Sequence, residues 1–427
     1  MTYILRLRLA LGFAAAFAVL PFLTIAHGQT LRERIGQRRD GTVGISYPVR
    51  AGVCGDGRTM IGDADGPDGF TMYVLDHGSV ISGNFEGDVR ARCVSGPARV
   101  LLTLRGGELV RVVPTVGGSG WREAPSVDLG TVDAQQAAAY LIATAAALPE
   151  QAARDAILAA SIADGARVAT PLVRMARDRS LPSPVREAAL RWVARTAERE
   201  GDRAAMDGVR AIAADEEDAT PVRERAIRNL GGRADDETFL RQLYGTVRNR
   251  ALQERIIRTL AEAGSSESRR WLHSVAESPR EDAALRERSV RVLAEQWGDY
   301  AFLRELYPRA TDGALRERIL RVLGEGGRVE DMRWLRSVAA NADESTALRE
   351  RALRVLSETG LPTRELAALY DSLGARALRE RTINLLAERG DKTAIDKLNA
   401  IARTEEDPDL KRRALRKLLE LKNEESR

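Results

Sequence analysis

Residues 315–325 read LRERILRVLGE, and close copies of this stretch recur along the second two thirds of the chain. The copies begin 30 to 37 residues apart, at Ala153, Val185, Val222, Leu252, Leu285, Leu315, Leu348, Leu378 and Leu410. Numbered from these residues and turned by 100° per residue, apolar positions 1, 5, 8 and 9 cluster on one side of a helix, and position 6 extends the stripe. Repetition at this period predicts a solenoid, in which each unit buries its apolar face against its neighbours.

A longer period lies over the first one. Tyr244, Tyr307 and Tyr370 are each 63 residues apart, and so are Trp271 and Trp334. We infer that a block of two repeats was duplicated, and that each repeat holds two helices of about 12 residues with Gly or Asp at the turns. The tyrosines are expected to pack between repeats, and the tryptophans at the rim of an apolar stripe.

The pattern Val/Leu-Arg-x-x-Ala-Leu-x-x-Leu in these copies resembles HEAT repeats, especially the short HEAT-like repeats of the phycobilisome lyase type. The resemblance extends over roughly 151–421. More loosely, the chain is similar to secreted bacterial HEAT-repeat proteins with a small N-terminal domain. The resemblance implies a mainly α fold, with a HEAT-like α-solenoid of about nine helix pairs over residues 133–427.

A different composition precedes the repeats. Residues 41–118 are rich in Gly and β-branched residues, which predicts a small β domain, and residues 119–132 are expected to form a linker. The expected strands are 42–47, 70–76, 89–94, 100–105 and 108–113. Gly106-Gly107 predicts a tight hairpin that sets Arg105 opposite Glu108. This pairing would place Val100, Leu102 and Leu104 on one face with Leu109 and Val113.

The acidic run 63–69 looks like a calcium-binding loop at first sight. Such a loop needs an oxygen ligand at position 5 and a glutamate at position 12, but here these positions hold Pro67 and Val74. A solvated turn is the better interpretation.

The N-terminus has the pattern of a targeting signal. Arg6 and Arg8 precede an apolar run, and small residues Ala26 and Gly28 precede a polar Gln29. Residues 1–28 are therefore expected to be a signal peptide, cleaved after Ala26 or Gly28, with an uncleaved membrane anchor as the alternative. After cleavage no membrane span is expected, and the protein would be periplasmic or extracellular.

The chain has two cysteines, Cys54 and Cys93. An even number of cysteines in an exported protein predicts a disulfide. It would close a loop of roughly 40 residues, which stabilises the small domain by about 4 kcal/mol in chain-entropy terms. Two thiols alone are too few to hold a metal ion.

Charges repeat on the second helix of each unit. Position 3 is usually Glu, position 7 Arg and position 11 Glu, an order that favours ion pairs one turn apart. Arginine at position 2 points toward the junction between repeats, where it is expected to bond carbonyls or acids; these residues are Arg223, Arg286, Arg316, Arg349 and Arg379. The candidate partner surface is formed by the arginines at positions 4 and 7, namely Arg225, Arg255, Arg288, Arg318, Arg351 and Arg381, and Arg258, Arg291, Arg321 and Arg354.

Charge balance excludes some function classes. The 66 basic and 62 acidic residues leave a net charge of +4, and a full repeat shows two Arg and two Glu on its exposed face. A nucleic-acid groove needs a surplus of positive charge, so no nucleic-acid partner is expected. The same count favours a mixed-charge surface for a protein partner.

The sequence has few residues of the types that support catalysis. The chain has three His, and neither Gly-x-Ser-x-Gly nor a Gly-Lys-Ser/Thr phosphate loop occurs in it. The resembling family includes bilin lyases and an iron-dependent hydroxylase with His-Glu metal motifs, whereas here His77 is followed by Gly78 and His273 by Ser274. We expect a non-enzymatic scaffold without cofactor or metal. The alternatives are binding of an envelope polymer through the β domain and an enzyme or enzyme subunit of the lyase type.

Overall fold

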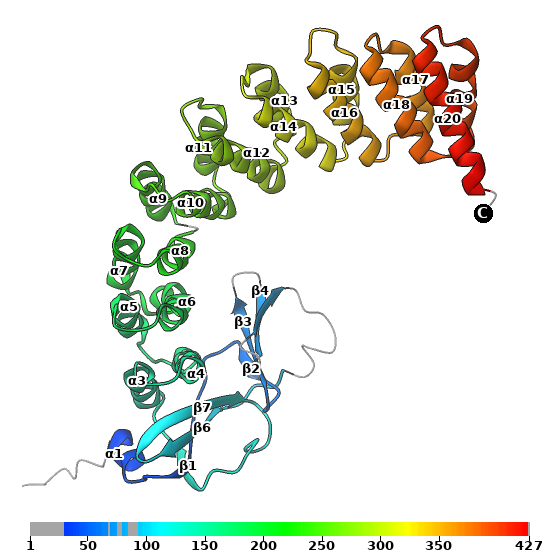
Figure 1. Cartoon of the computed structure of the whole chain (residues 1–427). Helices are drawn as coiled ribbons and strands as arrows, with labels where there is room; N and C mark the ends of the chain where they lie inside the picture. The colour runs from blue at the N-terminus through cyan, green and yellow to red at the C-terminus, as the bar shows by residue number, and fades with distance from the viewer. Residues whose placement is uncertain (1–29, 67–68, 75–78, 84–92, 232, 426–427) are drawn as a thin grey trace, which may run out of the picture.

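The computed structural model describes residues 30–66, 69–74, 79–83, 93–231 and 233–425. A small β domain lies inside one end of a long curved array of helices (Figure 1). The fold is mainly α, and its solenoid preceded by a disulfide-containing β domain agrees with the sequence prediction.

The β domain contains two four-stranded sheets. The first has the order β7-β6-β1-β8 and the second β2-β3-β4-β5. The strands are β1 (Gly41–Tyr47), β2 (Val53–Gly55), β3 (Met60–Gly66), β4 (Gly69–Val74), β5 (Ser79–Gly83), β6 (Ala98–Arg105), β7 (Glu108–Val116) and β8 (Val127–Thr131). Strands β2, β3, β5 and β8 were not predicted from the sequence. The predicted strand at 89–94 lies mostly outside the described residues, and Val94 forms an isolated bridge with Gly55.

The hairpin of β6 and β7 forms as expected at its tip, where Arg105 pairs with Glu108. Gly106 and Gly107 both have positive φ, at 59° and 91°, which a type I′ turn requires. A bulge shifts the register between Thr103 and Leu104. Because a shift of one residue exchanges the two faces of a strand, Val112 lies opposite Leu102, and the expected inward position of Val113 is wrong.

Two stretches outside the expected β domain are ordered against it. The predicted linker 119–132 contains β8, which pairs parallel to β1, so the linker prediction is wrong there. A short helix, α1 (Leu31–Gly36), precedes β1 and buries Leu31 and Ile35. The expected solvated turn at 63–69 is also wrong at its start, because Asp63 lies on β3 with no exposed surface.

The predicted disulfide is present. Cys54 on β2 is bonded to Cys93, with 5.1 Å between their Cα atoms. The bond ties the chain that follows β5 back to the first edge of the second sheet. Hydrogen bonds between Gly55 and Val94 continue this attachment in both directions.

The solenoid consists of nine helix pairs within the described part of 134–425, in agreement with the predicted number. The first helices of the pairs are α3 (Ala134–Ala145), α5 (Ala169–Arg177), α7 (Arg203–Ala214), α9 (Ala234–Thr246), α11 (Ser266–Glu277), α13 (Tyr300–Arg309), α15 (Val329–Ala340), α17 (Thr363–Ser372) and α19 (Lys392–Thr404). The second helices are α4 (Glu150–Ser161), α6 (Ser183–Glu200), α8 (Thr220–Arg228), α10 (Arg250–Ala263), α12 (Ala283–Trp297), α14 (Gly313–Glu325), α16 (Thr346–Glu358), α18 (Arg376–Arg389) and α20 (Pro408–Glu425).

The second helices line the inside of the curve and the first helices its outside (Figure 1). We call these the inner and the outer helices. Consecutive inner helices pack directly on one another, so their side chains form continuous rows along the concave face. Among the described residues, no helix has the length and apolar character that a membrane crossing requires.

The repeated motif accounts for this packing. In α14, Leu315, Ile319, Val322 and Leu323 occupy positions 1, 5, 8 and 9 and are buried, and Leu320 at position 6 is buried with them. Burial of such side chains stabilises the array by roughly 1.5–3 kcal/mol each relative to exposure. Asp282 and Asp312 cap the N-termini of α12 and α14 by accepting hydrogen bonds from Ala284 and Ala314 backbone N–H groups.

Candidate interaction surface

The arginine at position 2 of the inner helix bonds to the end of the outer helix in the same pair. In Arg186, Arg223, Arg286 and Arg349, the Nε atom donates to the carbonyl of an alanine ten residues earlier, at 2.7–3.2 Å. That alanine lies in the last turn of the outer helix, where carbonyl groups lack intrahelical partners and a positive charge is favourable. The expected bond to a carbonyl is present, but the carbonyl belongs to the same repeat and not to a neighbouring one. The expected pairing with acids between repeats is found in Arg186–Asp218, Arg316–Glu344 and Arg379–Glu405.

The tyrosines spaced by 63 residues mark a second type of junction. Tyr244, Tyr307 and Tyr370 are buried, and their hydroxyls donate to Glu281, Glu344 and Glu405 of the next repeat at 2.5–2.9 Å. Burial and the neighbouring glutamate raise the pKa of each tyrosine well above its usual value. The expected packing of these tyrosines between repeats is confirmed.

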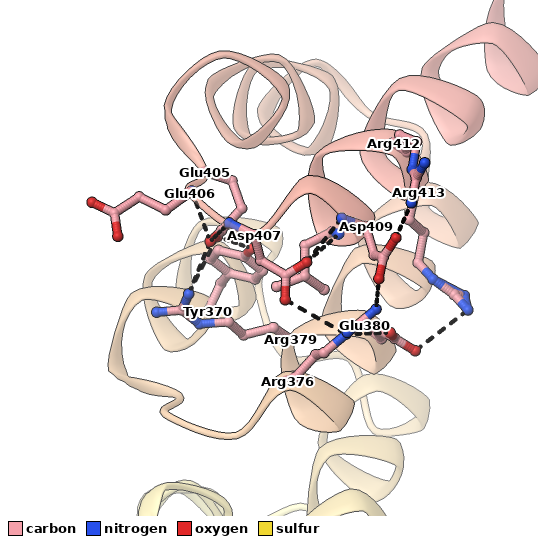
Figure 2. Close-up of polar contacts among 11 residues, drawn as sticks. Tyr370, Arg376, Arg379, Glu380, Glu405, Glu406, Asp407, Asp409, Arg412 and Arg413 are labelled. Carbon is pink, nitrogen blue, oxygen red and sulfur yellow. Dashed lines mark hydrogen bonds and ion pairs between the residues drawn. The ribbon is translucent and has the colours of Figure 1, made fainter.

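Figure 2 shows the last of these junctions, between α18 and α20. Arg379 donates to the carbonyl of Leu373 and to Glu405, which also accepts from Tyr370. Arg376 pairs with Asp407 and Asp409 at the start of α20. Acids that precede one inner helix thus hold arginines of the preceding inner helix.

The tryptophans lie where the sequence analysis placed them. Trp271 packs edge-on against Tyr244 with 4.9 Å between ring centroids, and Trp334 packs likewise against Tyr307 at 5.0 Å. Both indoles are half-buried. They join outer helices and do not form an exposed row of aromatic rings.

Arginine at position 4 forms a ladder between inner helices. Arg288 pairs with Glu254, Arg318 with Glu287, Arg351 with Glu317 and Arg413 with Glu380, at N–O distances of 2.8–3.5 Å. Each glutamate is position 3 of the preceding repeat. The sequence analysis expected position 3 to pair with position 7 of its own helix, and the described residues show no such pair. Position 4 approaches the preceding helix, so its guanidinium captures that glutamate first.

On three inner helices the arginine at position 4 does not form this ion pair within the part of the chain that the structure describes, and we call these the open rungs of the ladder. Arg225, Arg255 and Arg381 hold the same position 4, yet their Nε atoms are buried and have no hydrogen-bond partner among the described residues. Desolvation, followed by repulsion from Arg228 and Arg191, lowers the pKa of Arg225 to about 10. Desolvation and repulsion from Arg228 and Arg258 lower the pKa of Arg255 as well. Two of the three open rungs are therefore adjacent, on α8 and α10.

The arginines at position 7 have no ion pair among the described residues. They include Arg258, Arg291, Arg321 and Arg354 of the candidate partner surface, together with Arg191 and Arg228. Arg228 and Arg354 are exposed and the others half-buried. Of the predicted surface residues, Arg288, Arg318 and Arg351 are therefore occupied by ladder pairs. The arginines at position 7 remain available to a partner.

The β domain contacts the array through residues that the sequence analysis did not single out. Tyr73 of β4 stacks on Trp192 of α6, with ring centroids 5.2 Å apart. Arg195 donates to the Tyr73 hydroxyl at 3.0 Å and lies 3.5 Å from Asp63, which also forms a buried ion pair with Arg50. One signal was in the sequence: Arg195 occupies position 11, where five later repeats carry Glu.

A second contact fixes the base of the β domain. The buried Tyr47 hydroxyl donates to the carbonyl of Ala159 on α4 at 2.8 Å, and Val49 bridges to Ala163. α4 also packs on β7. On α4, burial raises the pKa of Asp155 to about 6.

His273 has a structural environment. Its ring stacks on Phe302 at 3.8 Å between centroids, and its Nε2 lies 2.9 Å from the Asp299 carboxylate, which also binds Arg269. Among the residues that the structure describes, no group of three or more His, Cys, Asp or Glu could hold a metal ion.

Comparison with known proteins adds little. No family model matches the chain, and no curated protein matches it. Among solved structures, human deoxyhypusine hydroxylase is 16% identical to this chain. The match covers 60% of this chain and 96% of that chain, with a TM-score of 0.26. An engineered protein is 14% identical, with 68% of this chain and 97% of that chain covered and a TM-score of 0.14. A circular tandem repeat protein is 18% identical, with 64% and 59% covered and a TM-score of 0.12.

Proposed function

We propose that the protein is an exported, non-catalytic scaffold whose inner helices bind a protein partner. The row of unpaired arginines at position 7 carries this proposal. A stacked solenoid presents such a row on a long concave surface at fixed spacing, which suits recognition of another protein chain. The half-buried guanidiniums retain polar groups without internal partners, and a partner can supply these.

Export rests on the N-terminal sequence pattern and on the disulfide. A signal-like segment at residues 1–28 and a cysteine bond are compatible with an oxidising compartment. We propose the periplasm or the outside of the cell. We also propose that the protein is secreted and that its repeats are of the HEAT-like type.

A cross-linking experiment tests the scaffold function. The full chain is exported in its disulfide-bonded form, its co-purifying proteins are identified, and each purified candidate is tested for saturable binding. Cross-links of a saturably bound partner to inner helices are expected. Cross-links confined to outer helices, or to the β domain, would contradict the proposed surface. Turnover of a bound small molecule would contradict the non-catalytic role.

A further inference from the structure

The first part of the concave face has an excess of positive charge. In the repeats that begin at Val185, Val222 and Leu252, positions 3, 4, 7 and 11 hold six arginines against four glutamates. In the next three repeats the same positions hold six of each. The expected balance of two Arg and two Glu therefore fails on the side occupied by the β domain (Figure 1). It fails again in the last repeat, where the same positions hold Arg412, Arg413 and Arg416 against Glu420.

Five of these six arginines form what we call the arginine cluster. It consists of Arg191 on α6, Arg225 and Arg228 on α8, and Arg255 and Arg258 on α10. They lie close enough to repel one another, because Arg228 acts on Arg191, Arg225 and Arg255. Arg195, the sixth, is already held by Tyr73 and Asp63 of the β domain.

The glutamates nearby neutralise the arginine cluster only in part. Glu187 attracts Arg191 and Arg225, and Glu224 and Glu262 attract Arg255. Glu254 is occupied by Arg250 on its own helix and by Arg288 of the next repeat. Glu187, Glu224 and Glu262 form no ion pair among the described residues, although Glu187 and Glu224 are the glutamates that a closed ladder would use. The buried Nε atoms of Arg225 and Arg255 lack acceptors. Half-buried guanidiniums without acceptors cost free energy, which an anionic ligand recovers.

The spacing of the arginine cluster indicates the form of the ligand. Packed helices lie about 8–10 Å apart, so the three inner helices present positive charge at about 10 Å intervals over about 20 Å. A segment in the polyproline II conformation has three residues per turn and advances about 3.1 Å per residue, so every third side chain lies on the same face at intervals of about 9 Å. A carboxylate at every third residue of such a segment would therefore meet one inner helix after another.

We propose that the arginine cluster binds an extended acidic segment of a protein partner, with Asp or Glu at every third residue. This rests on the proposed scaffold function and specifies where and how the partner is held. A nucleic acid fits less well, because three charge-balanced repeats, which begin at Leu285, Leu315 and Leu348, follow the arginine cluster, and unpaired glutamates lie between its arginines. The ladder pairs Glu254–Arg288, Glu287–Arg318 and Glu317–Arg351 neutralise position 4 on α12, α14 and α16, which interrupts a track for a continuous anion.

The test uses the full chain and a fluorescent peptide, Glu-Ser-Ser-Glu-Ser-Ser-Glu, followed by anisotropy. The double variant Arg228→Ala/Arg258→Ala is compared with Arg321→Ala/Arg354→Ala, which removes the same position 7 in balanced repeats. We expect the first variant to weaken binding by about tenfold or more and the second by less than about twofold. Circular dichroism of both variants checks that the helices remain formed.

Two further ligands make the outcome decisive. A peptide with the same residues but contiguous glutamates, Glu-Glu-Glu-Ser-Ser-Ser-Ser, is expected to bind more weakly than the spaced peptide. Equal loss in both double variants, or tighter binding of a single-stranded oligonucleotide than of either peptide, would overturn the inference. A protein partner whose saturable binding is unaffected by Arg228→Ala/Arg258→Ala would also overturn it, while leaving the scaffold function intact.

Discussion

The inner face of α12–α16 and that of α6–α10 are built from the same repeated helix, yet their arginines have different roles. In the later repeats, position 4 binds the glutamate of the preceding repeat, as in Arg318–Glu287. In the earlier ones, Arg225 and Arg255 hold that position, and their buried Nε atoms have no hydrogen-bond partner in the described part of the chain. A repeat motif thus specifies the packed core, but the use of its surface charges depends on the neighbouring repeat.

The β domain lies on the side of the array that holds the arginine cluster. Arg195 replaces the usual glutamate of position 11 and contacts Asp63 and Tyr73. The substitution that binds the β domain to α6 is therefore also one that shifts the local charge toward positive.

The largest effect is expected at position 2, where Arg286 and Arg349 are buried and Arg316 is half-buried. Replacing Arg286, Arg316 and Arg349 at position 2 with Glu puts carboxylates against outer-helix carbonyls, at a cost of about 3–5 kcal/mol per fully buried site. The matched triple at position 4, Arg288, Arg318 and Arg351, loses ladder pairs that are partly exposed and adds like charge. Thermal unfolding followed by helical circular dichroism should show a much greater loss for the first triple. Equal losses would mean that the two helix positions are assigned wrongly.

Asp155→Asn tests the burial of Asp155 on α4, at the end of the array that carries the β domain. The folded pKa of Asp155 is about 6 and its ordinary value 3.8, so the folded chain keeps a proton that the unfolded chain has lost. Stability should fall as pH rises from about 4 to about 6, and the variant should lack that fall. At pH 7 the variant should be more stable by at most about 3 kcal/mol. Urea denaturation across pH measures this, and the same slope in both proteins would contradict the buried environment of Asp155.

Arg195→Glu restores the residue type of the later repeats and should detach the second sheet from α6. The variant loses the bond to Tyr73 and places a carboxylate beside Asp63, which we expect to cost about 1–3 kcal/mol locally. Hydrogen exchange should become faster in β3 and β4, while the inner helices stay protected. Glu262→Arg, the reverse change on α10, is the control and should leave β3 and β4 unchanged. Unaltered exchange in Arg195→Glu would show that Arg195 does not hold the second sheet on α6.

Much of this architecture was predictable from the sequence, because solenoid packing depends on local apolar periodicity. The direction of the arginine at position 2 was predictable, because Arg349 follows the core residue Leu348 by one position and is therefore turned by 100° from it around the helix. The ladder was not predictable, because contacts between Arg318 and Glu287 depend on the rotation of one helix past the next. In the β domain, the bulge in β7 reversed the face expected for Val113, and β8 pairs with β1 although Val127 lies 84 residues after its partner Val43.

The most direct test of the division between the two regions is a pair of double-mutant cycles read by native-state hydrogen exchange, which reports the opening free energy of each helix. One cycle combines Glu287→Gln with Arg318→Gln and is read on α14. The other combines Glu224→Gln with Arg255→Gln and is read on α10. We predict a coupling of about 0.5–1 kcal/mol in the first cycle and close to zero in the second. Equal couplings would contradict an inner face that is paired in its later repeats and open beside the β domain.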